Sequence, residues 1–180
     1  MHLDGARLWE AIVAEGVEMK DYLDCFDTAS LCLSKGIGAP MGSVIVGPKE
    51  IIDRAIWFRK MFGGATRQTG MMAAAALVAL DEHLPRLAQV HSLASQVGRH
   101  LQDIGFQLLL PVSTNMVILD LKGMGIPGDI LVKYCKRHDV RAFHSGRLVF
   151  HHQTSKDGVS RLQSALLELI NDHQSYRRLT

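Results

Sequence analysis

The sequence predicts an α/β fold over residues 1–104, followed by a small α+β domain over residues 105–180. In the first part, short apolar runs bounded by glycine and proline alternate with segments whose apolar residues recur at helical spacing. Such apolar runs are typical of strands buried on both faces of a sheet. After Gly105 shorter strand patterns and amphipathic helices follow, which indicates a second, smaller domain.

The elements of the first part follow from spacing and from turn residues. A strand is expected to end at Asp4-Gly5. A helix is expected to follow it, because residues 8–17 have a helical pattern in which Glu10 lies off the apolar face. Strands are also expected at residues 29–33 and 43–46. A helix is expected from Pro48 to Gly63-Gly64, with a core face of Ile51, Ile52, Ala55 and Ile56. A buried helix over residues 66–82 follows, and after a break at Pro85 another helix ends at Gly105.

The second part is expected to contain a strand at residues 115–121 and a helix at residues 127–138. Residues 140–144 and 147–151 predict a hairpin that turns at Ser145-Gly146. A final helix is expected to place Val159, Leu162, Leu166, Leu169 and Ile170 on one face.

Composition and charge favour small-molecule chemistry. The 180 residues include 20 Lys and Arg against 18 Asp and Glu, a formal net charge of +2. The basic residues form no run of five or more, so neither a nucleic acid nor an anionic membrane is expected as a partner. The apolar run at residues 71–80 is well short of the roughly 20 residues that cross a bilayer.

The cysteines favour a reducing compartment. Cys25, Cys32 and Cys135 are odd in number and lack Cys-x-x-Cys spacing, so neither a disulfide framework nor a zinc ribbon is indicated. His151 and His152 are expected on opposite faces of a strand, and no metal site is predicted. The first residues lack signal-peptide organisation. We therefore expect a cytoplasmic protein, or a mitochondrial one if a targeting segment precedes these residues.

Asp4 and Arg7 follow the end of an expected strand, where open α/β sheets bind ligands. An aspartate there can pair with a ring nitrogen or a metal, and an arginine in the first helical turn can bind a carboxylate. The alternative is that Asp4 caps the helix and Arg7 faces solvent.

Lys35 lies in a glycine-rich loop directly after an expected buried strand. A lysine that is partly desolvated in such a loop has a lowered pKa and can form a Schiff base with an aldehyde. The alternative is a solvated loop lysine.

Residues 59–68 combine three cations with two glycines before an expected helix start. Free backbone N–H groups, the positive end of a helix and Arg67 together suit a phosphate or carboxylate. The alternative is a plain turn with Thr66 as the N-cap. Arg147, on the expected hairpin, would either bind an anion or face water.

Taken together, three segments resemble, in order and spacing, the low-specificity L-threonine aldolases, which belong to the aspartate-aminotransferase-like enzymes that use pyridoxal 5'-phosphate (PLP). The segments are residues 2–7 (HLDGAR), 34–43 (SKGIGAPMGS) and 59–70 (RKMFGGATRQTG). The resemblance extends over essentially the whole chain. It implies that residues 1–104 are the later part of a PLP-binding large domain with an incomplete, mostly parallel sheet, about three strands of seven.

The resemblance also implies roles for particular residues. Lys35 would bind the cofactor covalently, Asp4 would pair with its pyridinium nitrogen, and Arg67 would reach a PLP phosphate of a neighbouring subunit. Such an aspartate keeps the ring protonated, so that the ring can accept electrons. A homo-oligomer, either a dimer or a tetramer, is therefore expected.

The substrate implied by the resemblance is a small amino acid. Arg7 and Arg147 would hold its α-carboxylate, and Lys60 would lie near the substrate or cofactor. Two guanidinium groups that fix the carboxylate orient the bond to be broken. The implied reaction is retro-aldol cleavage of L-threonine or L-allo-threonine to glycine and acetaldehyde.

The chain departs from the family pattern in two ways. Phe150 replaces a small hydroxyl residue after Arg147, and nothing matches the family's upstream half, with its first phosphate loop and the histidine that stacks on the cofactor. Two alternatives therefore stay open: another PLP-dependent amino-acid lyase, such as one that catalyses β-elimination, and a non-catalytic fragment or isoform that binds full-length subunits.

Overall fold

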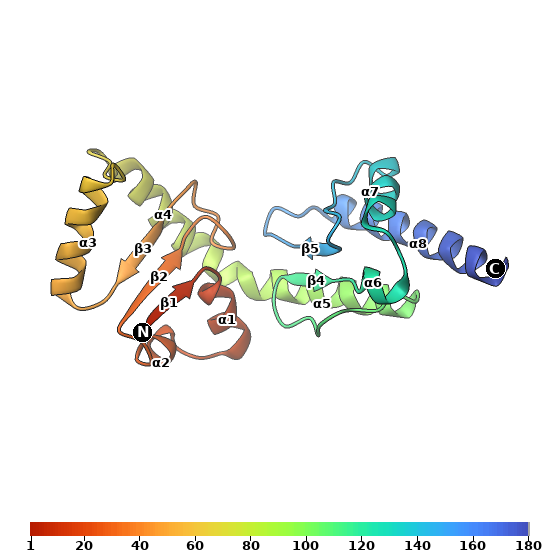
Figure 1. Ribbon diagram of the computed structural model, residues 1–180, viewed down its shortest axis with the longest axis horizontal. Coiled ribbons are helices and arrows are strands. Elements are labelled where there is room, and N and C mark those ends of the chain that lie inside the picture. Colours follow the sequence, from red (N-terminus) through yellow and green to blue (C-terminus); the bar gives the residue numbers. More distant parts are fainter. Residues whose placement is uncertain (180) are drawn as a thin grey trace. The chain divides into compact units, whose positions relative to one another are not determined.

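The computed structural model describes residues 1–179, and their side chains as far as Ser175. The chain forms two compact units, Met1–Ala88 and a second unit that begins at Gln89 (Figure 1). Helices and small sheets make up both units, which confirms the mixed α/β class. The division into domains 1–104 and 105–180 stays a prediction.

The sheet of the first unit has three strands, β1 (His2–Gly5), β2 (Thr28–Cys32) and β3 (Ser43–Val46), in the order β1-β2-β3. β1 runs parallel to β2, and β3 runs antiparallel to it. The strands expected at residues 29–33 and 43–46 are therefore confirmed. In β2 the side chains of Ala29 and Leu31 are buried, as its central position requires.

Helices connect β1 to β2 and follow β3, whereas a loop connects β2 to β3. They are α1 (Leu8–Glu15), α2 (Met19–Leu23), α3 (Lys49–Met61), α4 (Gly70–His83) and a short 3-10 helix (Leu84–Arg86). Pro85 lies in this 3-10 helix, so the predicted break is confirmed. The sequence pattern does not predict α2, because its five residues are too few to show a helical periodicity.

Burial in the first unit is lower than the apolar pattern predicts. No residue of α3 is buried, and the Ile51 and Ile56 side chains are exposed, so the expected core face is wrong for this chain. In β3, Val44 and Ile45 are exposed as well. Both elements have the predicted local structure, but the first unit does not cover their apolar side chains.

The helix expected over residues 66–82 also differs from the prediction. α4 begins at Gly70 with Thr69 in the N-cap position, so Thr66 does not cap it. Within α4 only Ala76 and Ala79 are buried, whereas Leu77 is 63% exposed. α4 is therefore half covered, and the prediction of a buried helix is wrong.

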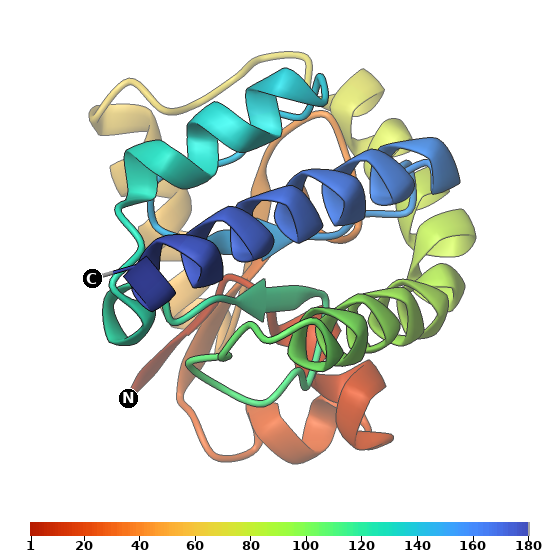
Figure 2. The same ribbon diagram turned by 90° about the vertical axis from the view of Figure 1, so that its right-hand side faces the viewer.

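The second unit has its own continuous core. Its elements are α5 (Leu87–Asp103, which starts at the end of the first unit), β4 (Met116–Ile118), α6 (Leu121–Met124), α7 (Gly128–Arg137), β5 (Arg147–Val149) and α8 (Lys156–Leu179). Helices α7 and α8 lie side by side (Figure 2). The core includes Val97, Leu101, Val117, Leu131 and the predicted face of α8: Val159, Leu162, Leu166, Leu169 and Ile170.

The hairpin predicted for residues 140–144 and 147–151 is wrong. β5 pairs with β4 instead, with Val117 opposite Leu148. Beyond the strand ends, the N–H of Phe150 donates to the carbonyl of Asn115 (2.8 Å), and the Asn115 amide donates to the carbonyl of Phe150 (3.0 Å). Residues 140–144 form no strand, so β5 has no hairpin partner before it.

None of the described helices is both long enough and apolar enough to span a membrane.

Gly5 provides a test of how tightly the end of β1 packs. A Cβ at Gly5 would lie 2.6 Å from the carbonyl oxygen of Ser30 and 3.0 Å from Leu31 Cδ2. We expect Gly5→Ala to lower the free energy of unfolding by about 1–3 kcal/mol, because backbone must move to make room. Urea denaturation checks this. The matched control is Gly70→Ala, where a Cβ has open space, and we expect equal or higher stability there.

Glu168 of α8 links this helix to α7. Its carboxylate bonds to Nε2 of His138 (2.8 Å) and accepts a hydrogen bond from Arg137 (2.7 Å). The hydrogen bond from His138 lowers the pKa of the Glu168 carboxyl; partial burial opposes this, and Arg137 adds to the lowering. The folded state thus holds the Glu168 proton less tightly than the unfolded state does. The contacts of the Glu168 carboxylate therefore stabilise the fold above pH 4.5, the ordinary pKa of the group, and this contribution is lost as the pH falls.

We expect Glu168→Gln to reduce the urea midpoint at pH 7, and the difference from the unaltered chain to shrink as the pH falls below 4.5. Urea titrations of both proteins over a pH series measure this difference in midpoint. Glu82→Gln, at an exposed carboxylate of α4, is the control. A Glu168→Gln effect that does not change with pH would contradict this explanation.

Candidate active site

The parallel pair β1 and β2 brings three of the predicted residues to one edge of the sheet. Asp4 lies opposite Ser30 in the register, one residue before β1 ends, and Arg7 follows that end. Lys35 lies in the loop after β2. Because both strands run in the same direction, their carboxyl ends share an edge, where α/β sheets bind ligands.

Helix α1 ties the two strand ends together. It begins at Leu8, and the Trp9 indole N–H donates to the carbonyl of Cys32 at the end of β2 (3.1 Å). The N-cap of α1 is Arg7, with no side-chain cap, so Asp4 does not cap this helix. Asp4 is exposed and Arg7 is half-buried. Both side chains therefore remain available for a ligand.

The loop that carries Lys35 is held by its own backbone. The N–H of Gly38 donates to the carbonyl of Lys35 (2.9 Å), and the N–H of Ala39 donates to the carbonyl of Leu33 (2.9 Å). Ile37 is completely buried below the loop, and its carbonyl contacts Nδ1 of His83 at 2.7 Å. The expected partial desolvation of Lys35 is not seen in this chain, since its side chain is exposed.

Glu10 packs directly against the lysine loop, which sequence reasoning missed. It was expected off the apolar face of α1, yet its side chain is only 2% exposed. A Cβ at Gly36 would overlap the Glu10 carboxylate. Glycine at position 36 therefore lets the backbone beside Lys35 approach α1. Helical spacing contained no signal for this contact, which depends on how the loop folds back.

The positive charge of Lys35 acts on the residue that ends β2. Partial burial raises the pKa of the Cys32 thiol, but hydrogen bonds from the hydroxyl and backbone of Ser34, together with the charge of Lys35, outweigh burial and lower that pKa overall. The Cys32 sulfur lies 3.5 Å from the Ser34 hydroxyl. The charge of Lys35 is therefore one of the groups that favour the Cys32 thiolate.

Lys60 and Arg67 lie on another part of the first unit, around the connection from α3 to α4. Both side chains are exposed. The connection turns at Gly63, with φ at 77°, and the N–H of Gly64 donates to the carbonyl of Arg59 (2.8 Å). Arg67 lies between the two helices. The predicted helix start near Thr66 would have placed it in the first turn of α4, so its expected position is wrong.

Arg147 belongs to the second unit, where it begins β5 opposite Ile118. Strand alternation directs Leu148 and Phe150 into the core, and Arg147 and Val149 outward. Phe150 is 3% exposed, so the unit accommodates it at this position. The Arg147 side chain is exposed and does not pack into the core.

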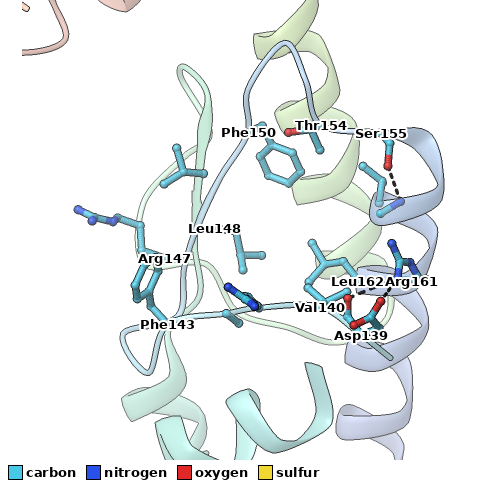
Figure 3. Close-up of a pocket in the computed structure, with 15 residues that line it drawn as sticks. Asp139, Val140, Phe143, Arg147, Leu148, Phe150, Thr154, Ser155, Arg161 and Leu162 are labelled. Carbon is cyan, nitrogen blue, oxygen red and sulfur yellow. Dashed lines mark hydrogen bonds and ion pairs between the residues drawn. The ribbon is translucent and has the colours of Figure 1, made fainter. Parts of the chain in front are cut away.

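A cavity of about 370 Å³ lies between β5, the segment before it and the start of α8. Val140, Leu148, Phe150 and Leu162 form its apolar wall (Figure 3). The Arg147 side chain extends away from this cavity in Figure 3. Arg147 is nevertheless among the residues that line the cavity. Among the described residues, no group of three or more His, Cys, Asp or Glu side chains is arranged to hold a metal ion.

Comparisons with known proteins identify relatives of this chain. The low-specificity L-threonine aldolase of Candida albicans is 41% identical over 177 residues, which are 98% of this chain and 47% of that protein. The enzyme of the same name from Saccharomyces cerevisiae is 40% identical over 169 residues, 93% of this chain and 43% of that protein. These matches confirm the resemblance found in the sequence.

A solved structure of a candidate L-allo-threonine aldolase from Listeria monocytogenes has the same fold, with a TM-score of 0.74 at 18% identity. The match covers 96% of this chain and 51% of that one. This chain thus spans about half the length of the relatives it matches. The sequence model of the beta-eliminating lyase family matches residues 1–123, well over half of the chain. The chain therefore belongs to the beta-eliminating lyase family.

Proposed function

We propose that this chain carries the cofactor-binding lysine of a PLP-dependent aldehyde-lyase that cleaves L-threonine or L-allo-threonine to glycine and acetaldehyde. The observation that carries the proposal is the shared edge of β1 and β2, with Asp4 near the end of one strand and Lys35 in the loop after the other. The names of the relatives support the choice of reaction.

The residues at this edge fit PLP. The cofactor's aldehyde requires an amine and its ring nitrogen an acidic partner, and these are the groups that Lys35 and Asp4 present. When bound, PLP would supply an electron sink for the pair released as the Cα–Cβ bond of the substrate breaks. Lys35 Nζ would hold the cofactor, and the Asp4 carboxylate would keep a proton on its ring nitrogen.

The loop structure supports this role for Lys35. Ile37 is buried and Gly36 packs against Glu10, so the backbone on one side of the lysine is fixed while its side chain stays free. A fixed backbone limits the positions that Nζ can take, which is the contribution that orientation makes to catalysis.

Arg7 would bind the α-carboxylate of the substrate, since a guanidinium at the start of α1 follows directly from the strand that holds Asp4. Arg147 lies in the other unit. Carboxylate binding by Arg147 is supported by the resemblance and by its exposed side chain, which does not pack into the core. Lys60 would lie near the substrate or cofactor. A homo-oligomer, in which Arg67 reaches the phosphate of a neighbouring subunit's cofactor, and a cytoplasmic location complete the proposal.

Borohydride labelling tests the role of Lys35. We expect PLP followed by borohydride to modify Lys35 several-fold more than Lys49, an 86% exposed lysine that forms an ion pair with Asp53. Occupancy will be low, because about half of the relatives' length is outside this chain. Peptide mapping by mass spectrometry locates the label. Lys35→Ala removes the preferred site, and Asp4→Asn weakens it, since the ring nitrogen then lacks an anionic partner.

Equal labelling of Lys35 and Lys49, unchanged by Asp4→Asn, would overturn the cofactor assignment. The reaction is tested in a fusion that adds the part of the S. cerevisiae relative outside the match. We expect this fusion to release acetaldehyde from L-threonine, and Lys35→Ala to abolish that release. Pyruvate and ammonia from serine, without acetaldehyde from threonine, would indicate β-elimination instead.

A further inference from the structure

Glu10 is a carboxylate in the interior of the first unit. It lies in the first turn of α1, where Leu8 is buried as well. Carboxylates are rarely buried to this degree, because leaving water costs free energy. A hydrophobic residue would fill the same position without that cost. Packing of α1 alone therefore does not account for a glutamate at position 10.

The Glu10 carboxylate occupies the space that a side chain at position 36 would need. A Cβ added at Gly36 would lie 2.0 Å from Glu10 Oε1 and 2.9 Å from Glu10 Cδ. The same Cβ would lie 3.5 Å from Cδ2 of Leu87. The φ angle of Gly36 is not positive, so its backbone conformation is open to other residues. The close approach of Glu10 is therefore what requires glycine beside Lys35.

Helix α1 contacts the lysine segment on both sides of Lys35. The Trp9 indole N–H donates to the carbonyl of Cys32 (3.1 Å), three residues before the lysine. Glu10 contacts Gly36, one residue after it. Two neighbouring residues of one helix therefore support the short segment that carries the amine.

The same turn of α1 also fixes Arg7. Arg7 is the N-cap residue, and its carbonyl accepts a hydrogen bond from the N–H of Glu10 (3.0 Å). A helical turn is stiff, because its hydrogen bonds fix the backbone dihedral angles. One turn of helix thus connects the guanidinium proposed to bind the substrate carboxylate with the side chain that supports the lysine loop.

We propose that Glu10 is a positioning residue for Lys35: its carboxylate limits how far the backbone at Gly36 can move and so sets where Lys35 Nζ lies relative to Arg7. This inference rests on the proposed function, which gives Lys35 and Arg7 their roles. A misplacement of about 1 Å can cost roughly 100-fold in rate, so the position of the amine matters as much as its presence. The shape of the Glu10 side chain performs this role, and glutamine has the same shape.

Reciprocal substitutions in the full 180-residue chain test the contact. Gly36→Ala should lower the ratio of Lys35 to Lys49 labelling by PLP and borohydride at least threefold, because the new Cβ overlaps Glu10 and displaces the loop. Adding Glu10→Ala removes the overlapping carboxylate, so the double variant should recover at least half of the original ratio. Glu10→Gln alone should keep the ratio within twofold.

A second glycine separates positioning from a loss of stability. Gly47 follows β3 at the opposite end of the sheet, and a Cβ there would lie 2.6 Å from Cγ2 of Thr28. Gly47→Ala should therefore lower the urea midpoint, as Gly36→Ala does, and leave the labelling ratio unchanged. An equal fall of the ratio in both variants would show that Glu10 has only a structural role.

Hydrogen exchange gives a readout that needs no cofactor. In Glu10→Ala, peptides over residues 33–39 should exchange at least tenfold faster than in the unaltered chain, whereas Glu10→Gln should retain slow exchange. Unchanged exchange in Glu10→Ala, or a Gly36→Ala defect that the added Glu10→Ala does not repair, would overturn the positioning role alone. Equal labelling of Lys35 and Lys49 in the unaltered chain would instead overturn the proposed function, and the role of Glu10 with it.

Discussion

The candidate site depends on the parallel pairing of β1 and β2. The register that places Asp4 opposite Ser30 brings the carboxyl ends of two strands to one edge, although their sequences are more than twenty residues apart. Every other feature of the edge follows from this pairing: Arg7 starts α1 directly after β1, and the lysine loop starts directly after β2. An antiparallel pair would place the two functional segments at opposite ends of the sheet.

Around that edge, buried groups hold the backbone and leave the chemical groups outside. Trp9 ties α1 to the end of β2, Ile37 anchors the lysine loop in a core cluster, and Gly36 allows Glu10 to pack against it. The Lys35 side chain is exposed, and only its backbone carbonyl takes part in holding the loop. Such a division keeps the packing that holds the loop apart from the amine that would react.

Local patterns predicted the elements well because strands and helices depend mainly on neighbouring residues. β3 has the predicted bounds, and α1 begins at the predicted Leu8. Pairing and burial depend on distant residues, and there the sequence was insufficient. The predicted hairpin before Phe150 is wrong, and the partner of this segment is instead β4 with Asn115, which lies 35 residues before Phe150. The burial of Glu10 is likewise decided by a loop 26 residues away.

The two units show that an amphipathic pattern predicts an apolar helix face but does not identify the element that packs against it. The stripe of α3 and the face of α8 are similarly apolar, yet α8 packs into a core and α3 buries no residue. The difference is that α5, α7 and β4 supply the second layer that α8 needs, whereas no second layer covers α3. Because hydrophobic burial requires two layers, an amphipathic pattern such as that of α3 does not by itself place a helix in a core.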